Sequence, residues 1–209
     1  LDAAVQGVLT SAFGFQGQKC SACSRAIVVG KVHDEFCARL KEKTERIVIG
    51  DPADPKTYLG PMVSEKALRT ALDYVTIGKR EGTLLCGGNR LDRPGFFLAP
   101  TVFTGIEGRH RLAQEEIFAP VLAVLKVADF DEGLRTANDT VYGLTGAVYS
   151  HDPARLKRAA EEFHVGNLYL NRKCTGAMVD VHPFGGFNLS GTDSKAGGRE
   201  YLLLFLQAK

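Results

Sequence analysis

An apolar run that is rich in β-branched residues lies near the middle of the chain: Val121-Leu122-Ala123-Val124-Leu125-Lys126-Val127. A run of this length and composition, entered through a proline, predicts a buried strand. The segments on either side of it indicate what kind of sheet the strand belongs to.

Predicted helices and strands alternate on both sides of this run. Helices are expected over residues 1–13, 32–49, 64–81, 129–138 and 153–163. Strands are expected over residues 25–29, 83–86, 102–103, 144–149 and 165–170. This alternation predicts an α/β fold, in which a mostly parallel sheet is flanked by helices.

The last part of the chain follows a different pattern. Residues 172–198 show no period and contain two glycine pairs, which predicts a long ordered loop. Residues 200–206 are apolar and predict a final strand, whose free edge invites pairing with a second copy of the chain. We therefore expect one domain over residues 1–190 and a C-terminal loop and strand over residues 191–209 that serves a homo-oligomer.

The composition limits the classes of partner. The 26 Lys and Arg residues nearly balance the 24 Asp and Glu residues, so no nucleic-acid partner is expected. The longest apolar run, Tyr201 to Leu206, is far shorter than the roughly 20 residues of a membrane-spanning helix, so no membrane partner is expected. Five cysteines and no visible signal peptide favour a reducing compartment, the cytoplasm or, in a eukaryote, the mitochondrial matrix. Because the chain opens on Leu1 and directly in a helical pattern, we expect it to be a piece of a longer protein.

Cys20 is the first candidate for chemistry. A predicted helix ends at Gly14, a small polar turn follows, and Cys20 precedes a predicted strand. The thiolate is the reactive form of cysteine, and Lys19 and Arg25 are cations that could favour it. The alternative is a small buried cysteine without chemistry, which is the commoner role of a free thiol.

Cys20 and Cys23 also form a C-x-x-C pair, which is typical of a redox dithiol or of half a zinc site. No second C-x-x-C exists in the sequence, and His33 and His110 lack ligand spacing, so no metal site is expected. A redox module remains an alternative, and it predicts a reversible disulfide between Cys20 and Cys23. The other alternative is that Cys23 only packs.

Two further segments carry residues that suit binding. In Glu115-Glu116-Ile117-Phe118-Ala119-Pro120, a carboxylate could accept hydrogen bonds from ribose hydroxyls and an aromatic edge could support a flat ring. In Thr175-Gly176-Ala177 and Pro183-Phe184-Gly185-Gly186-Phe187, small residues expose backbone N–H groups that can form an anion-binding nest. A solvated acidic turn and a packed glycine-rich turn are the respective alternatives.

Taken in this order, the segments resemble the catalytic half of an aldehyde dehydrogenase. The resemblance spans essentially the whole chain and rests on Gly17-Gln18-Lys19-Cys20, on residues 115–120, 138–144 and 165–171, and on residues 183–187 with Ser190-Gly191. Ser21, the run Phe163-His164-Val165-Gly166-Asn167 and Thr175-Gly176-Ala177 are similar to the members that oxidise L-glutamate γ-semialdehyde to glutamate with NAD in proline breakdown.

The resemblance implies a catalytic residue and two cofactor contacts. Cys20 would attack the aldehyde, and its own backbone N–H would help to hold the oxyanion. Glu116 would bind the ribose next to the nicotinamide of NAD, and Phe118 would support the nicotinamide end.

The resemblance also implies four substrate contacts. The hydroxyl of Ser21 and the backbone N–H groups of Gly176 and Ala177 would hold the α-carboxylate of the aldehyde substrate. Phe184 would pack on the aliphatic stem of that substrate. These roles are carried over by position in the sequence, not worked out from geometry.

Some of the family's machinery is expected outside these residues. The dinucleotide-binding domain, the general-base glutamate and the asparagine of the oxyanion hole are expected upstream of the matched region, so the N-terminal domain is predicted to be absent here. We therefore expect the chain alone to be inactive; the alternative is a non-enzymatic remnant of the same fold that assembles with family members or binds a ligand. Ala119 replaces a glycine usual in the family, which predicts a shift in the turn after Phe118.

Overall fold

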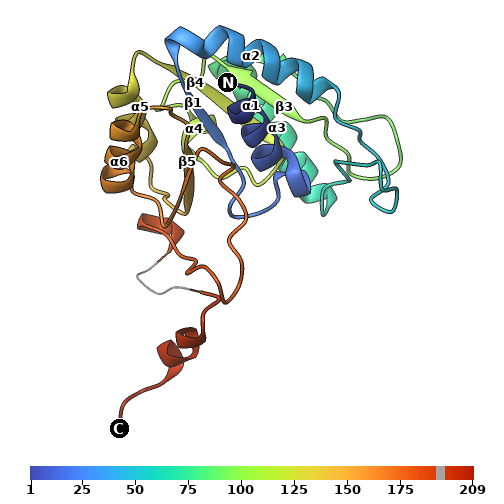
Figure 1. Cartoon of the computed structure of the whole chain (residues 1–209). Coiled ribbons are helices and arrows are strands. Elements are labelled where there is room, and N and C mark those ends of the chain that lie inside the picture. Colours follow the sequence, from blue (N-terminus) through green and yellow to red (C-terminus); the bar gives the residue numbers. More distant parts are fainter. Residues whose placement is uncertain (192–195) are drawn as a thin grey trace.

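The chain folds as an α/β structure in the computed structural model, which describes residues 1–191 and 196–209 (Figure 1). The α/β class and the mostly parallel sheet predicted from the sequence are confirmed. The predicted loop over residues 172–198 includes residues 192–195, which lie outside the described part of the chain.

The helices and strands of the described residues follow in alternation along most of the chain. The α-helices are α1 (Asp2–Phe13), α2 (Gly30–Glu45), α3 (Glu65–Glu81), α4 (Arg111–Gln114), α5 (Phe130–Asn138) and α6 (Pro153–Glu162). The strands are β1 (Arg25–Val29), β2 (Thr83–Cys86), β3 (Thr101–Thr104), β4 (Val121–Val127), β5 (Thr145–Val148) and β6 (Asn167–Leu170). Three 3₁₀ segments complete them: η1 (Gly14–Gly17), η2 (Asn188–Ser190) and η3 (Arg199–Phe205).

The strands of the described residues form two sheets. The larger sheet has the order β1-β4-β3-β2, and both neighbours of β4 run parallel to it. β2 pairs antiparallel with β3, because a loop rather than a helical crossover joins these two strands. β5 and β6 form a separate parallel pair.

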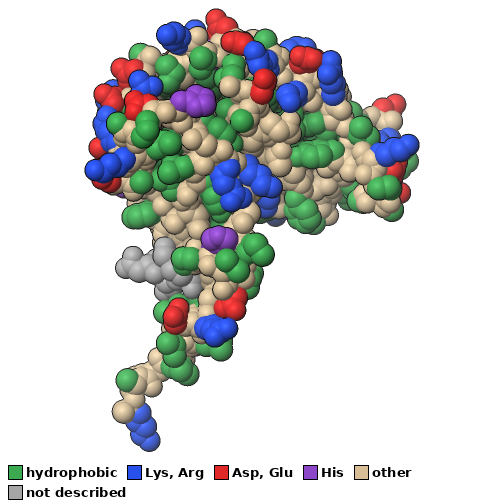
Figure 2. Space-filling view, viewed as in Figure 1, with side chains coloured by type: hydrophobic (Ala, Val, Ile, Leu, Met, Phe, Trp, Pro, Cys, Tyr) green, Lys and Arg blue, Asp and Glu red, His purple; other side chains and the backbone are tan. Residues whose placement is uncertain are grey.

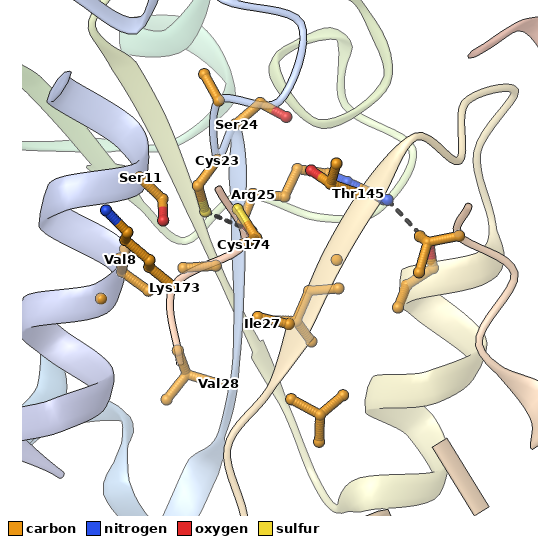
Figure 3. A pocket seen from close by; sticks show the side chains of 18 of the residues that line it. Val8, Ser11, Cys23, Ser24, Arg25, Ile27, Val28, Thr145, Lys173 and Cys174 are labelled. Atoms are coloured by element: carbon orange, nitrogen blue, oxygen red, sulfur yellow. Dashed lines mark hydrogen bonds between the residues drawn. The ribbon is translucent and has the colours of Figure 1, made fainter. Parts of the chain in front are cut away.

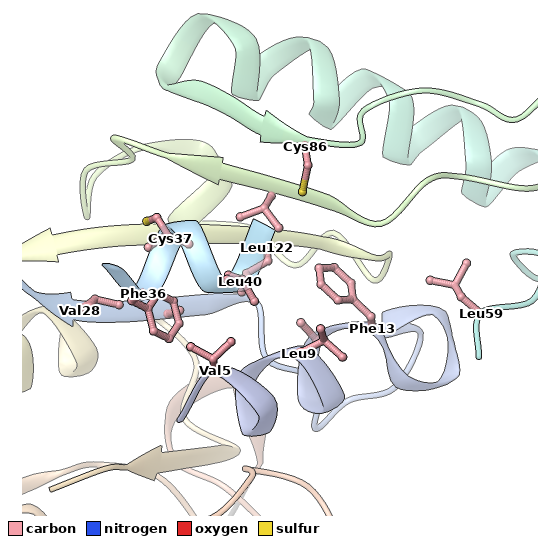
Figure 4. Close-up of a cluster of buried hydrophobic side chains, with 14 residues drawn as sticks. Val5, Leu9, Phe13, Val28, Phe36, Cys37, Leu40, Leu59, Cys86 and Leu122 are labelled. Atoms are coloured by element: carbon pink, nitrogen blue, oxygen red, sulfur yellow. The ribbon is translucent and has the colours of Figure 1, made fainter. Parts of the chain in front are cut away.

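The core lies on both faces of β4, as the apolar run at residues 121–127 predicts. Leu122 and Val124 pack into a cluster with residues of α1 and α2, among them Leu9, Phe13 and Leu40 (Figure 4). The alternate β4 residues belong to a second cluster with α3 and β3, whose members include Val121, Ala123, Leu125, Leu68, Val75 and Phe103. The side chains of a strand point alternately to its two faces, so one apolar strand supplies both clusters.

Helix ends agree with their local chemistry, and α2, which begins at Gly30 rather than residue 32, differs most from the prediction. The hydroxyl of Ser64 accepts a hydrogen bond from Ala67 N (3.2 Å) and caps α3, which begins and ends as predicted. α2 ends at Glu45 rather than near residue 49. The residues that follow include the β-branched Ile47, Val48 and Ile49, and Ile49 forms a β-bridge with Leu59.

The predicted final strand over residues 200–206 is wrong, because Arg199–Phe205 is a 3₁₀ helix. Its backbone groups bond locally, with Leu206 N donating to Leu203 O (3.2 Å) and Tyr201 N to Gly198 O (3.1 Å). Local bonds of this kind satisfy the backbone where no neighbouring strand is available. The apolar side chains of this segment are exposed and project from the body of the molecule (Figure 2).

Membrane crossing needs a helix that is both long and apolar. Among residues 1–191 and 196–209, none of the helices meets both conditions.

Candidate active site

A sharp turn after α1 sets the position of Cys20. Phe15, Gln16 and Gly17 all adopt positive φ, at 57°, 57° and 64°. At Gly17 a Cβ atom would lie 2.5 Å from the carbonyl oxygen of Ala119, so only glycine allows this close approach. The turn therefore places the Cys20 segment directly against the segment of residues 115–120.

Three hydrogen bonds hold the Cys20 segment in place. The side-chain carbonyl of Gln18 accepts from Val63 N (2.9 Å), Ala22 N donates to Lys19 O (3.0 Å), and Cys23 N donates to Ser11 O (3.1 Å). Cys20 itself is exposed. The chain thus presents this thiol on an anchored turn, where a small molecule can reach it.

Cys20, Glu116 and Phe118 line one cavity of about 960 Å³. β1 forms one wall of this cavity and β5 another. Phe118 has φ 56° and is 44% exposed, so its ring stands free of the core. The structure therefore brings together the predicted nucleophile and both predicted cofactor contacts, which come from segments nearly a hundred residues apart.

The two glutamates before Phe118 have different surroundings. Glu115 accepts hydrogen bonds from Arg111 Nε (2.7 Å) and from the hydroxyl of Tyr74 (2.6 Å). These bonds, the one from Arg111 above all, lower the pKa of Glu115 to about 2. Glu116 is exposed and lines the cavity. Glu116 is therefore the carboxylate of the pair that is free to meet a ligand.

The turn after Phe118 accommodates Ala119 without a glycine conformation. The residue with positive φ is Phe118, and Ala119 is buried against Gly17. Ala119 itself does not adopt a positive φ. The carbonyl oxygen of Ala119 forms the close contact that requires glycine at position 17.

Ser21 is connected to the segment that carries the predicted carboxylate contacts. Its carbonyl oxygen accepts from the hydroxyl of Thr145 (3.4 Å) and from the thiol of Cys174 (3.6 Å). Cys174 and Thr175 are buried, and Gly176 follows with φ 115°. The backbone of residue 21 is thereby held close to the segment that leads to Gly176 and Ala177.

Gly176, Ala177 and Phe184 do not line the cavity that Cys20 lines. Ala177 and Phe184 are half-buried, and Gly176 is exposed. Phe184 pairs with Ala196 through two backbone hydrogen bonds, in which Phe184 N donates over 3.3 Å and Ala196 N over 2.7 Å. Their substrate roles stay predictions, because the structure shows no direct contact between them and Cys20.

The two cations considered beside Cys20 have different positions. The guanidinium of Arg25 donates to Thr136 O (3.2 Å) and Ala137 O (3.0 Å), which holds it at the end of α5. Lys19 lines the cavity, and burial lowers the pKa of its ammonium group. Arg25 lines the same cavity, so the two cations differ in that the guanidinium of Arg25 is bonded to backbone carbonyls.

No role is predicted for Cys174 from the sequence, yet it lies opposite Cys23 in the wall of the cavity (Figure 3). The interaction between the two neighbouring thiols lowers the pKa of Cys174 and raises that of Cys23. The two residues are too far apart in sequence for spacing to reveal them. The only signal was the position of Cys174 immediately before Thr175-Gly176.

The site thus has a reactive residue type on a turn at a cavity, in an α/β fold with a mostly parallel sheet. The whole chain, residues 1–209, matches the model of the aldehyde dehydrogenase family. The chain therefore belongs to the aldehyde dehydrogenase family.

Relatives within the family are similar over the full chain. It is 56% identical over 209 residues to 1-pyrroline-5-carboxylate dehydrogenase of Geobacillus sp. (strain WCH70), covering 100% of this chain and 41% of the relative. It is 52% identical to the protein of that name from Bacillus subtilis (strain 168), with the same coverage. A crystal structure of 1-pyrroline-5-carboxylate dehydrogenase from Thermus with bound NAD superposes with a TM-score of 0.96 at 54% identity, covering 100% of this chain and 40% of that one. The chain spans about two fifths of the length of the curated relatives that it matches.

Proposed function

We propose that this chain is the nucleophile-bearing part of an enzyme that oxidises L-glutamate γ-semialdehyde, the open form of 1-pyrroline-5-carboxylate, to L-glutamate with NAD. The observation that carries the proposal is the exposed thiol of Cys20, held on an anchored turn in the wall of the cavity that Glu116 and Phe118 also line. The relatives named 1-pyrroline-5-carboxylate dehydrogenase support this choice of substrate.

The proposed chemistry takes place on the sulfur of Cys20. The thiolate adds to the aldehyde carbon, and the resulting oxyanion is held by the backbone N–H of Cys20. Loss of a hydride from the same carbon turns the thiohemiacetal into a thioester. Water then breaks the carbon–sulfur bond, which releases the carboxylate product and restores the thiol.

The described residues fit the nicotinamide end of NAD. The carboxylate of Glu116 is exposed at the cavity and offers acceptors for ribose hydroxyls. The exposed ring of Phe118 offers a flat apolar surface beside it. When bound, NAD supplies the acceptor for the hydride.

The α-carboxylate of the substrate is assigned to Ser21, Gly176 and Ala177. The hydrogen bonds from Thr145 and Cys174 to the carbonyl of Ser21 support a short distance between these segments. Gly176 has φ 115°, a conformation in which its N–H and that of Ala177 can turn toward one anion. Phe184 is assigned to the aliphatic stem.

We further propose a homo-oligomer in which the η3 segment contacts a second copy. Its apolar residues are exposed, including Phe205 at 71% and Leu202 at 72%. Exposed apolar side chains in a contiguous run are typical of a surface that another chain covers. The cytoplasmic location stays a prediction from the composition.

Protection of Cys20 against alkylation tests the proposed function. The purified chain is treated with iodoacetamide, and adducts are located by peptide mass. L-Glutamate γ-semialdehyde is expected to slow alkylation of Cys20 several-fold, because the aldehyde occupies the sulfur. L-Glutamate, which has no aldehyde, is expected to give no such protection.

Two buried thiols and a variant of one predicted substrate contact, Ser21, serve as matched controls. Alkylation of Cys37 and Cys86 should not respond to the semialdehyde, and Ser21→Ala should weaken protection by the semialdehyde more than protection by acetaldehyde. Equal protection by glutamate, or none by either aldehyde, would overturn the proposal. The chain alone is expected to form no NADH from semialdehyde and NAD, and measurable NADH would contradict that expectation.

A further inference from the structure

Cys23 and Cys174 form a pair of thiols that the proposed reaction does not use. Cys23 follows the Cys20 turn and Cys174 follows β6, and their side chains face each other beside Ser11 and Lys173 (Figure 3). All five cysteines of the chain are present as free thiols. The two thiols are thus unbonded and face each other, which a cross-link between them requires.

Each thiol of the pair is held by a backbone acceptor. Cys23 Sγ donates to Arg25 O (3.4 Å) and Cys174 Sγ donates to Ser21 O (3.6 Å). Both acceptors lie within two residues of Cys23, so the two sulfurs are anchored on the same short piece of backbone. This common anchor holds both thiols against the same segment.

The surroundings distinguish the two sulfurs chemically. The neighbouring thiol of Cys23 lowers the pKa of Cys174. The same pair interaction and burial raise the pKa of Cys23. Cys174 is therefore the thiol of the pair that ionises more readily, so it is the one expected to react first with an oxidant, and Cys23 is the one expected to resolve the product.

We propose that Cys23 and Cys174 are a redox modification site, which closes to a reversible disulfide when the chain meets a peroxide. The thiolate of Cys174 attacks one peroxide oxygen, forming a sulfenic acid and releasing hydroxide. Cys23 Sγ then attacks the sulfenic sulfur, and the second oxygen leaves as water. Two thiols and one hydrogen peroxide give one disulfide and two waters, and a dithiol reductant reverses the step.

The pair differs from the C-x-x-C of the sequence. Cys20 is exposed, whereas Cys23 is directed toward Cys174 and Arg25 O. The disulfide would join the segment after Cys20 covalently to the segment before Gly176. This inference is independent of the proposed function, because it needs neither Cys20 nor turnover.

Peptide mapping after oxidation tests the proposal. The reduced 209-residue chain is treated with one equivalent of hydrogen peroxide, alkylated, and digested with trypsin without reductant. The expected product is peptide 20–25 joined to peptide 174–195, which dithiothreitol separates again. Because trypsin leaves Cys20 and Cys23 on one peptide, the same experiment is run on Cys20→Ser, where the cross-link should persist.

Two variants and one comparison complete the test. Cys23→Ser should abolish the cross-linked peptide, and Cys86→Ser should leave it unchanged. If Cys23→Ser does not fold, fragmentation of the cross-linked peptide from the unmodified chain identifies the bonded sulfur. A bond between Cys20 and Cys23, loss of the cross-link in Cys20→Ser, or complete alkylation of both Cys23 and Cys174 after peroxide would overturn the proposal.

Discussion

The larger sheet and the C-terminal η3 segment are built from similar residues and have opposite environments. β4 buries Leu122 and Val124 between helices, whereas the leucines and Phe205 of η3 are exposed. The strand has neighbours on both edges and helices on both faces, and η3 has none of these within the described residues. Apolar composition therefore makes a core only where the rest of the chain returns to cover it.

Matched phenylalanines give the strongest test of this contrast. Phe103 is fully buried in the cluster of α3 and β3, and Phe205 is 71% exposed. Phe103→Ala is expected to lower the free energy of unfolding by about 3–5 kcal/mol, because it leaves a cavity. Phe205→Ala should change it by less than about 0.5 kcal/mol. Urea unfolding measures both, and equal losses would show that η3 is packed as firmly as the sheet.

Two glycines with similar positive φ sharpen the comparison at the candidate site. Gly17 and Gly105 have φ of 64° and 71°, but a Cβ at Gly17 would meet Ala119 O at 2.5 Å and one at Gly105 would meet nothing within 4 Å. Gly105→Ala should cost about 1–2 kcal/mol from the left-handed conformation alone. Gly17→Ala should cost about 1–3 kcal/mol more, because the backbone must shift.

Thermal unfolding of these two variants, with alkylation of Cys20 as a second readout, checks the expectation. Only Gly17→Ala should change the alkylation rate of Cys20, since Gly17 sets the turn. Equal unfolding temperatures for the two variants would mean that the contact between Gly17 and Ala119 does not constrain the site.

A helix cap in the folded body and an exposed ion pair in the C-terminal region are expected to differ less in their contribution to stability. Ser64 caps α3 through Ala67 N, and Arg199 approaches Asp180 at 3.8 Å with a side chain that is 90% exposed. Ser64→Ala is expected to cost about 1 kcal/mol of stability. Arg199→Ala should cost close to zero, as exposed ion pairs do. Chemical denaturation resolves the difference, and a larger loss for Arg199→Ala would reverse the expected order.

The dependence of folding stability on acidic pH should be the smallest of these effects. Hydrogen bonds from Arg111 and Tyr74 lower the pKa of Glu115 to about 2, below its value in the unfolded chain. The folded state therefore gains stability from this carboxylate above about pH 4.3, and loses it as the pH falls toward 2. Glu115 is 39% exposed, so solvent screening reduces the gain to about 0.2–1 kcal/mol. Glu115→Gln should flatten the stability curve between these pH values, and an unchanged curve would show that the carboxylate contributes nothing there.

Most of the fold could be predicted because its signals are local. The cap at Ser64, the glycine after α1 and the apolar run of β4 each act within a few residues, and these elements form where expected. The antiparallel direction of β2 and the 3₁₀ form of Arg199–Phe205 depend on which segments lie nearby in space. A strand pattern predicts a strand only if an edge is available to pair with it.

The candidate site could be predicted in part for the same reason. Residue types at short spacing drew attention to Cys20 and to residues 115–120, and the family resemblance assigned roles to Glu116 and Phe118. All three residues line one cavity. Cys23 and Cys174 come together because the chain after β6 passes next to the segment that follows Cys20. The spacing of residues in the sequence does not reveal such a contact. The carboxylate contacts at Gly176 and Ala177 were assigned by resemblance and stay predictions.

The parallel pairing of β1 with β4 also means that β1 is synthesised well before the strand it pairs with. Arg25 lies opposite Ala123, so β1 leaves the ribosome roughly a hundred residues before its partner, a delay of about 5–20 seconds at ordinary elongation rates. During that interval α1, α2 and β1 expose the faces that later form the first core cluster. The order of strands in the sheet, rather than their composition, thus determines how long the nascent chain is open to misassociation.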